Sequence, residues 1–220
     1  MSADVKGNPA SGPGGRAART AAQVIAAATT LFLERGYLAT TLTDVAEHAG
    51  VAPRTVYVRF GTKADLLKQV IDTAIVGDPL PIDVAHRDGT RIALTAPTLQ
   101  ERIAVHAAGT RAIMERSGPL MAVAAEAAPL EPTIADAATA GRADALHQLR
   151  QFWETAHADG LLHPDADLDW ILTTSSLIGT VDTYLVLTRT NGWTADTYQE
   201  WRYRTWMHLA TTPGPPPSAT

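Results

Sequence analysis

The sequence predicts an all-α protein with a small N-terminal helical domain and a larger C-terminal helical domain. Apolar residues recur at spacings of three and four along most of the 220 residues, and no segment has the strict alternation typical of strands. Breaks rich in Gly and Pro divide this pattern into separate helices. The length suits one or two domains of about 100–200 residues each. We therefore expect a three-helix domain at 19–66 and a helical domain at 67–212, between a flexible arm at 1–18 and a disordered tail at 213–220.

The N-terminal segment is rich in Gly, Pro, Ser and Ala, a composition that buries too little apolar surface to order itself. We expect it to be a flexible arm that ends with Arg16 and Arg19. Basic side chains on such an arm can enter the minor groove of DNA, and a simple solvated tail is the alternative.

A short helix is predicted to begin near Thr41 and to end at Gly50. Thr41 and Asp44 have the Thr-x-x-acid spacing with which two side chains satisfy the free N–H groups at a helix start. An apolar stripe of three residues follows, and Gly50 then permits a tight turn. The stripe consists of Val45, Ala46 and Ala49.

A second short helix is predicted to begin at Pro53, because proline suits the first helical position, where its missing N–H costs nothing. Val56 and Phe60 lie four residues apart and should face the core. The other side chains of this helix cannot all be buried with them, so they form a surface that can meet DNA bases and phosphates. The segment therefore predicts a DNA-binding helix-turn-helix. The side chains of that surface are Arg54, Thr55, Tyr57, Val58 and Arg59.

The motif resembles the TetR family of bacterial transcriptional regulators. The resemblance covers roughly residues 20–70, including the first helix and its Glu34-Arg35-Gly36-Tyr37 stop, and is much weaker beyond. One departure is Ala52, where the family often has a serine that caps the second helix; such a cap is worth about 1 kcal/mol. The residues that carry the resemblance are Ile25, Ala28, Leu31, Phe32, Thr41, Ala46, Ala49, Gly50, Val51, Thr55, Tyr57, Phe60, Lys63 and Leu66.

The resemblance implies two kinds of DNA contact. Pro53, Arg54 and Thr55 would read base edges, and Arg54 has the geometry to bind guanine O6 and N7. Phosphate contacts carry no sequence information and serve to position the protein. The alternative is a structural pair of helices whose charges are only solvated. The residues implied as phosphate donors are Thr43, Tyr57, Arg59 and Lys63, the last following Thr62 as a helix cap.

The net charge of −5 is divided unevenly along the chain. Residues 1–76 carry eight Lys or Arg against six Asp or Glu, a net of +2, so residues 77–220 carry −7. An acidic bulk repels phosphate and favours a single basic face for binding DNA.

The remaining elements are all predicted to be helical. A linking helix spans 64–76, and a loop with one helical turn spans 77–97. Ser117-Gly118-Pro119 should break the next helix, because proline removes a helical hydrogen bond. The helices expected beyond residue 97 cover 97–116, 120–128, 131–158, 167–190 and 194–211.

The last two predicted helices are more apolar than one core-facing stripe needs. The resemblance implies that they form a homodimer interface, and monomer core is the alternative. It also implies that an unidentified small-molecule effector binds the C-terminal domain and changes the distance between the two DNA-binding domains of the dimer. Mixed aromatic, soft and polar side chains suit such a pocket, although each alone also suits ordinary core. The candidate lining residues are His106, Met114, Met121, Trp153, Trp170 and Thr174.

Enzyme, metal and membrane functions find little support in the sequence. Cysteine is absent, and no nucleophile elbow, dinucleotide fingerprint or phosphate-binding loop occurs. Glu154-x-x-His157 has the spacing of a di-iron motif, but no second Glu-x-x-His occurs to complete such a site. A metal held by His157, His163 and Asp165 at the helix end is the other possibility, and a wet, acidic loop explains these residues more simply. With no apolar run of about 18 residues, we expect a soluble cytoplasmic protein without a cofactor. The sequence predicts a ligand-responsive repressor of a near-palindromic operator; the alternative is a helical small-molecule-binding protein without operator-specific DNA binding.

Overall fold

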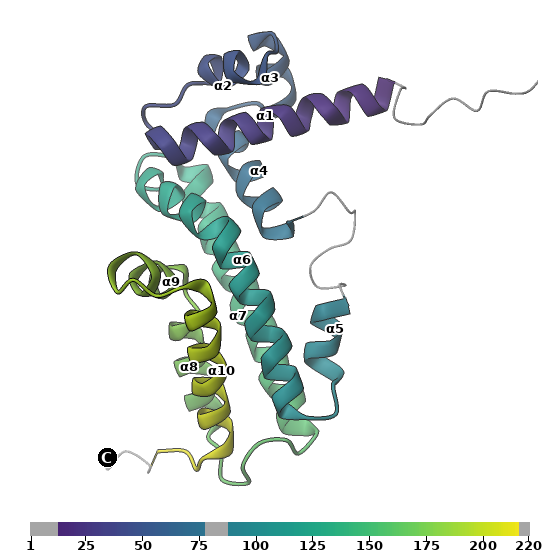
Figure 1. Ribbon diagram of the computed structural model, residues 1–220, viewed down its shortest axis with the longest axis vertical. Helices are drawn as coiled ribbons and strands as arrows, with labels where there is room; N and C mark the ends of the chain where they lie inside the picture. The colour runs from purple at the N-terminus through teal and green to yellow at the C-terminus, as the bar shows by residue number, and fades with distance from the viewer. Residues whose placement is uncertain (1–12, 78–87, 216–220) are drawn as a thin grey trace, which may run out of the picture. The chain divides into compact units, whose positions relative to one another are not determined.

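The computed structural model describes residues 13–77 and 88–215, and every regular element within these ranges is helical (Figure 1). The chain divides into two compact units. Unit 1 comprises Met1–Asp72 and Val123–Ala135, and unit 2 comprises Thr73–Ala122 and Asp136–Thr220. The predicted all-α fold is confirmed. The predicted boundary after residue 66 differs from this division, because unit 1 also includes residues 67–72 and a second, distant segment.

Unit 1 contains α1 (Pro13–Arg35), α2 (Leu42–Ala49), α3 (Pro53–Phe60) and the first part of α4 (Lys63–Val76). Helix α1 packs against α2, and α2 packs against α3. Their apolar stripes meet in a common core, as the spacing of the sequence predicts. The fully buried residues of this core include Val24, Ala28, Phe32, Val45, Ala46, Val56, Leu66, Leu67 and Val70.

Helix α1 begins earlier than the sequence predicts. The expected arm at 1–18 is wrong for residues 13–18, which are helical, so Arg16 and Arg19 lie on α1; residues 1–12 lie outside the described part. Arg16, Ala17 and Ala18 are strong helix formers, and they extend the helix upstream despite two preceding glycines.

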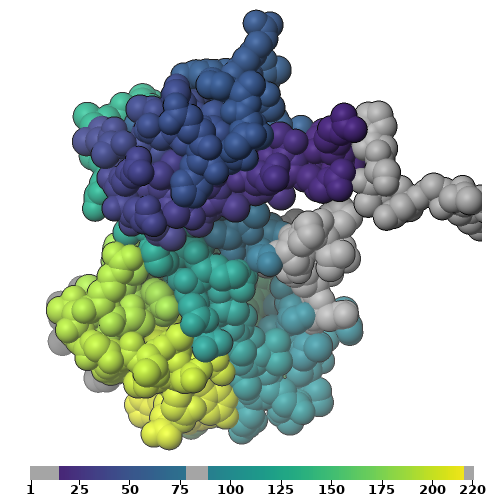
Figure 2. Space-filling model, turned by 45° about the horizontal axis from the view of Figure 1, so that its top comes forward, coloured from purple at the N-terminus to yellow at the C-terminus, as the bar shows by residue number. Residues whose placement is uncertain are grey.

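Unit 2 contains most of the remaining helices, and two of them continue into unit 1. Figure 2 shows the segment of α9 and η3 beside α10 on the surface of this unit. The elements are α5 (Asp88–Thr95), α6 (Leu99–Ala127), α7 (Pro132–Ala158), α8 (Leu168–Ile178), α9 (Val181–Leu185), a π-helical turn η3 (Val186–Thr190) and α10 (Ala195–Thr211). In the loop expected at 77–97, the structure has the two-turn helix α5, while residues 78–87 lie outside the described part.

The break predicted at Ser117-Gly118-Pro119 is wrong, because α6 passes through it with Pro119 inside the helix. Proline removes the hydrogen bond to the carbonyl four residues earlier. Two contacts lie beside this position: Ser117 Oγ donates to Ile113 O at 2.8 Å, which does not replace the bond that Pro119 cannot make to Glu115 O, and the Tyr184 ring lies over Gly118. A Cβ at Gly118 would be 3.3 Å from that ring, so the small residue lets α9 pack closely.

The single helix predicted at 167–190 is also wrong, because α8 ends before Gly179 and the chain bends by 51° into α9. Thr180 stabilises the new start, since its Oγ1 accepts from the N–H of Thr183 at 3.2 Å. Among the described residues, no single helix is long and apolar enough to cross a membrane. The bent pair formed by α8 with α9 and η3 passes that test by length and composition only.

The end of the chain is held to unit 2 as far as the structure describes it. The N–H of Gly214 donates to Asp165 O at 2.9 Å, and the N–H of His163 donates to Ala210 O at 2.8 Å. Residues 213–215 therefore depart from the predicted disordered tail, and residues 216–220 lie outside the described part.

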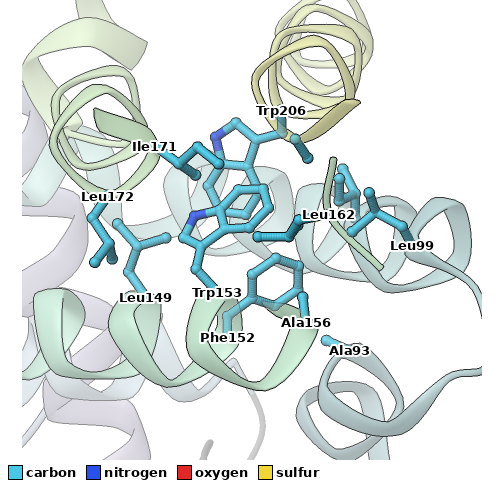
Figure 3. Packing of buried hydrophobic residues seen from close by; sticks show 12 residues of the cluster. Ala93, Leu99, Leu149, Phe152, Trp153, Ala156, Leu162, Ile171, Leu172 and Trp206 are labelled. Carbon is cyan, nitrogen blue, oxygen red and sulfur yellow. The ribbon is translucent and has the colours of Figure 1, made fainter. Parts of the chain in front are cut away.

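An aromatic cluster forms the centre of unit 2 (Figure 3). Trp153 lies 4.9 Å from both Phe152 and Trp206 between ring centroids, and the His106 ring lies 4.6 Å from Trp206. Trp153 and Trp206 are almost completely buried. Such contacts join α6, α7 and α10 in one core.

Candidate functional site

Local signals at the start of α2 position the candidate nucleic-acid interface. Thr41 Oγ1 accepts from the N–H of Asp44 at 3.1 Å, and the Asp44 carboxylate accepts from the N–H of Thr41 at 2.9 Å. The Thr41 hydroxyl also donates to Asp44 Oδ2 at 2.7 Å, and this bond, followed by the one from the Thr41 N–H, holds the pKa of Asp44 below its ordinary value. The predicted capping box is confirmed, and it fixes the direction in which α2 enters the motif.

The turn between α2 and α3 depends on Gly50, which has φ +67, a left-handed conformation that favours glycine. The N–H of Val51 then donates to Ala46 O at 3.0 Å and closes the end of α2. Helix α3 begins with Pro53 at its first position, and Ala52 supplies no side-chain cap, as predicted.

The two faces of α3 differ in character, as the sequence predicts. Val56 and Phe60 are buried, whereas Tyr57 is 52% exposed and Val58 is 75% exposed. The sequence placed Val58 on this surface without assigning it a particular contact, and its exposed methyl groups suit the thymine methyl. The other candidates on this surface are Thr43, Pro53, Arg54 and Arg59, all exposed, and Thr55, which is half-buried.

A groove of about 700 Å³ runs between the start of α1 and α3. Three arginines, Arg16, Arg54 and Arg59, line it, and no acidic residue is among its lining residues. Sequence reasoning placed Arg16 on a flexible arm and did not consider Thr20, which also lines the groove. Arg16 and Thr20 are four residues apart, so they share one face if the first helix extends upstream. That spacing was the signal in the sequence that could have identified them. Three guanidinium groups around a concave surface create a positive potential that suits phosphate.

Lys63 differs from the other candidate donors because its ammonium is engaged within unit 1. Its Nζ donates to Tyr37 O at 2.8 Å and lies 4.1 Å from the centroid of the Tyr37 ring. Burial lowers the pKa of Lys63, and the charge of Glu131 opposes that shift. An ammonium has three donors, so a phosphate contact remains available beside this bond. The cap predicted at Thr62 is present, since its Oγ1 accepts from the N–H of Asp65 at 3.1 Å.

Tyr37 also binds the segment between α6 and α7. Its hydroxyl donates to Glu131 Oε1 at 2.8 Å, and both residues belong to unit 1. Burial raises the pKa of Tyr37, and the adjacent Glu131 carboxylate raises it further. Sequence reasoning missed this contact because the two residues are 94 positions apart.

The six residues predicted to line a ligand pocket do not all come together. His106 and Trp153 both pack against Trp206 in the aromatic cluster, and Trp153 Nε1 donates to Ser175 Oγ at 3.0 Å. Trp170 does not join this cluster of buried side chains, since it is 48% exposed in the single chain. The remaining three, Met114, Met121 and Thr174, are half-buried.

Helix α10 contributes polar residues to the core that sequence reasoning missed. Tyr198 and Trp206 lie on the helix predicted at 194–211, for which a dimer interface and monomer core were both open; they are 0% and 1% exposed, and Arg202 between them is 3% exposed. The signal was their spacing of four, which puts Arg202 on the same helical face as two large aromatic residues. Nε and Nη1 of Arg202 have no hydrogen-bond partner among the described residues.

Within the part of the chain that the structure describes, no three His, Cys, Asp or Glu side chains come together as a metal site requires. His163 Nδ1 instead accepts from the N–H of Asp165 at 3.1 Å. That contact closes a local turn.

Residues 24–70 match a known family, the bacterial regulatory proteins of the tetR family. The HTH-type transcriptional regulator TtgR of Pseudomonas putida is 44% identical over 57 residues, which is 26% of this chain and 27% of that protein. The HTH-type transcriptional repressor BdcR of Escherichia coli is 33% identical over 66 residues, 30% of this chain and 34% of that protein. The chain thus matches about a quarter to a third of these relatives' lengths.

Similarity in fold extends over nearly the whole chain. The structure of a TetR-family transcriptional regulator from Rhodococcus sp. has a TM-score of 0.66 at 16% identity and covers 88% of this chain and 100% of that one. A complex of SmeT with triclosan has a TM-score of 0.66 at 18% identity, covering 91% of this chain and 98% of that one. At these identities the likeness establishes the fold.

Proposed function

We propose that this chain, which belongs to the TetR family of bacterial regulatory proteins, is a homodimeric repressor that binds a near-palindromic DNA operator and is released by a small molecule. The observation that carries the proposal is the groove lined by Arg16, Arg54 and Arg59 beside the exposed face of α3. Basic side chains beside a short exposed helix suit DNA recognition, because the helix can enter the major groove while the arginines bind phosphates.

The side chains of unit 1 divide into two roles in this proposal. Pro53, Arg54 and Thr55 at the start of α3 read base edges, because the first turn of a recognition helix enters the major groove. The donors around them hold phosphates and fix the position of the helix. These donors are Thr43, Tyr57, Arg59 and Lys63, with Arg16 added from the groove.

Dimerisation is needed because two recognition helices must lie about 34–36 Å apart to enter successive major grooves. The dimer would form through the two helices predicted at 167–190 and 194–211. The first of these, which the structure divides into α8, α9 and η3, offers apolar surface: Leu177 and Trp170 on α8 are 64% and 48% exposed, and Val186 in η3 is 53% exposed. Large exposed apolar side chains on adjoining elements are typical of a protein interface.

The effector acts through helices that belong to both units. Helices α6 and α7 begin or end in unit 1 at Val123–Ala135 and run on into unit 2. Glu131 in that segment binds Tyr37, whose carbonyl in turn binds Lys63 at the start of α4. A ligand in unit 2 changes DNA affinity only by binding the competent and incompetent states differently, and these shared helices supply the physical route. A protein that regulates transcription in this way would act in the bacterial cytoplasm, where the DNA is.

The decisive experiment selects bound sequences from a random pool of double-stranded DNA with the purified full-length protein, and measures the mass of the protein in the same buffer. We expect a near-palindromic sequence and a dimer. No enrichment at low or moderate salt would reject the regulator and favour a helical small-molecule-binding protein that carries the motif without operator-specific binding. A recovered operator then serves as the probe for effectors.

A further inference from the structure

Arg202 is a buried cation without a counter-charge. It is 3% exposed, no carboxylate forms an ion pair with it among the described residues, and two of its nitrogens lack hydrogen-bond partners. Burial lowers the pKa of its guanidinium, and the neighbouring Tyr198 opposes the shift. A buried, unpaired charge is costly, so its presence in a core requires an explanation.

Arg102, the other buried arginine of unit 2, has partners that Arg202 lacks, although its Nη1 is also without a hydrogen-bond partner among the described residues. Its Nη2 binds Asp159 Oδ2 at 2.5 Å, and its Nε donates to Ala96 O at 2.7 Å. Arg102 is 4% exposed, almost the same as Arg202. The two arginines therefore differ in their partners and not in their burial.

The groups around Arg202 are also donors without acceptors. The Tyr198 hydroxyl and Trp206 Nε1 are buried and have no hydrogen-bond partner among the described residues. The guanidinium lies 4.2 Å from the centroid of the Trp206 ring, and Gly179 leaves it room, because a Cβ there would be 2.9 Å from Nη1. A guanidinium beside a phenol and an indole suits an acceptor that carries negative charge.

The walls beside these donors are aromatic. The Trp206 ring contacts the rings of His106, Phe152 and Trp153. Of these, Phe152 and Trp153 are labelled beside Trp206 in Figure 3. Met207 packs against the same core, and its flexible side chain can yield space to a ligand. An acceptor with an apolar body fits this combination better than a free inorganic ion.

We propose that Arg202 binds the carboxylate of a hydrophobic organic acid, with Tyr198 and Trp206 as further donors and the aromatic cluster around its apolar body. This inference rests on the proposed function, because it gives the chemical class of the effector. A carboxylate from a second copy of the chain is the competing partner. Arg202 is 3% exposed in the single chain, so a side chain fixed to another backbone reaches it less readily than a small acid.

The test uses full-length protein and two matched pairs of probes: phenylacetate with phenylacetamide, and octanoate with octanamide. Calorimetric titration at neutral pH should give binding of at least one carboxylate and at least tenfold weaker binding of its amide. Arg202→Met should weaken carboxylate binding at least tenfold, since it removes the charge while keeping the bulk of the side chain. The matched control is Arg204→Met on the same helix, an exposed arginine that should leave binding unchanged.

Several outcomes would overturn the inference. These are equal binding of carboxylates and amides, absence of binding by both acids, chloride competing as well as the acids do, and an unchanged Kd in Arg202→Met. If Arg202→Met fails to fold, Arg202→Lys is the second variant, because it keeps the charge but loses the paired donors. An unchanged Kd in Arg202→Lys, together with arginine Nε–H NMR signals of the wild type that do not shift on adding the acid, would overturn the inference. Loss of the wild-type dimer in Arg202→Met would instead support the carboxylate of a second copy.

The two proposals fail separately. If the protein selects a palindrome but binds no carboxylate, the regulator remains and the anion site is rejected. If it binds carboxylates through Arg202 but enriches no DNA, the site remains and the regulator is rejected. If both hold, the acid that binds should also lower operator affinity in the wild type and not in Arg202→Met.

Discussion

The Tyr37 hydroxyl donates a 2.8 Å hydrogen bond to Glu131 Oε1, and this joins the turn after α1 to the segment between α6 and α7. The acceptor is a carboxylate, so the bond is charge-assisted and stronger than a neutral one, and it is partly buried beside the Tyr37 ring.

Tyr37→Phe should lower the free energy of unfolding by about 1–3 kcal/mol, because it removes a hydrogen bond to a charged group and keeps the ring. Chemical denaturation of the full-length protein measures the change. Tyr57→Phe is the matched control, since Tyr57 is 52% exposed and should change the value by less than about 0.5 kcal/mol. Similar losses in both variants would contradict a special role for the Glu131 contact.

Arg54→Ala should relax base preference, because a bidentate contact with guanine contributes about 1–3 kcal/mol of discrimination. Lys63→Ala should weaken binding to all DNA similarly and reduce the salt slope by about 1. Titrations of the selected operator and single-base variants, at several salt concentrations, separate the two effects. Lys68→Ala is the control, because Lys68 lies on the same helix and pairs with Asp72. Equal, sequence-independent losses in the Arg54 and Lys63 variants would remove Arg54 from base reading.

Ala52→Ser should stabilise the protein by about 0.5–1 kcal/mol, because Ala52 has the extended backbone of a helix cap and no side-chain acceptor. A serine oxygen there accepts a free N–H of the first turn of α3. The reverse change is Thr41→Ala, which removes the capping box of α2 and should cost about 1 kcal/mol. Thermal unfolding compares the two, and a destabilised Ala52→Ser would show that the start of α3 is constrained by something other than its missing cap.

The free energy of unfolding should fall as the pH is lowered from about 6.5 towards 3, owing to His106. Burial, and then the charge of Arg202, lowers the pKa of His106 from 6.5 to about 3. Between these values the unfolded chain binds a proton that the folded chain excludes, so stability is present above the unfolded pKa and is lost with acid. One such group gives a slope of up to about 1.36 kcal/mol per pH unit.

Denaturation between about pH 4.5 and 6.5 tests this, because the lowered pKa values of Asp44 and Asp65 act at lower pH, below their ordinary 3.8. His106→Gln should flatten the slope in this window. The exposed histidine of α10 provides the control, and His208→Gln should leave the slope as in the wild type. A slope that persists in His106→Gln would assign it to another group.

Leu177→Glu should weaken the dimer at least tenfold, because it places a charge on an apolar surface of α8 that is 64% exposed in the single chain. Sedimentation over a range of protein concentrations measures the dissociation constant. Leu38→Glu is the control, because Leu38 is 73% exposed and lies outside α8, α9, η3 and α10. An unchanged dissociation constant in Leu177→Glu would exclude this face of α8 from the interface.

The sequence was sufficient where local chemistry determines structure. The cap at Thr41, the left-handed Gly50 and the proline at the start of α3 are each specified within a few residues, and all three were predicted. It failed where packing between distant residues decides. Pro119 stays inside α6 while the Tyr184 ring lies over Gly118, and no window of sequence contains both.

The residues of the candidate sites also divide into those that the local sequence predicts and those that depend on packing between distant parts of the chain. The exposed residues of α3 were predictable from the buried face that Val56 and Phe60 define. The groove was missed because Arg16 joins it only through the upstream extension of α1. Arg202 was missed because an arginine is expected in solvent, and its spacing from Tyr198 and Trp206 was the one local sign of burial.

Unit 1 consists of two separate segments of the chain, and this limits how it can be exchanged with the corresponding domain of a relative. The chain passes between the units after Asp72, after Ala122 and after Ala135. In a chimera joined only near residue 72, the relative's residue at the position of Tyr37 would face the native Glu131. Nothing would then ensure that the two form a hydrogen bond. Specificity can therefore be transplanted faithfully only if the donor's equivalent of Val123–Ala135 moves together with its first 72 residues.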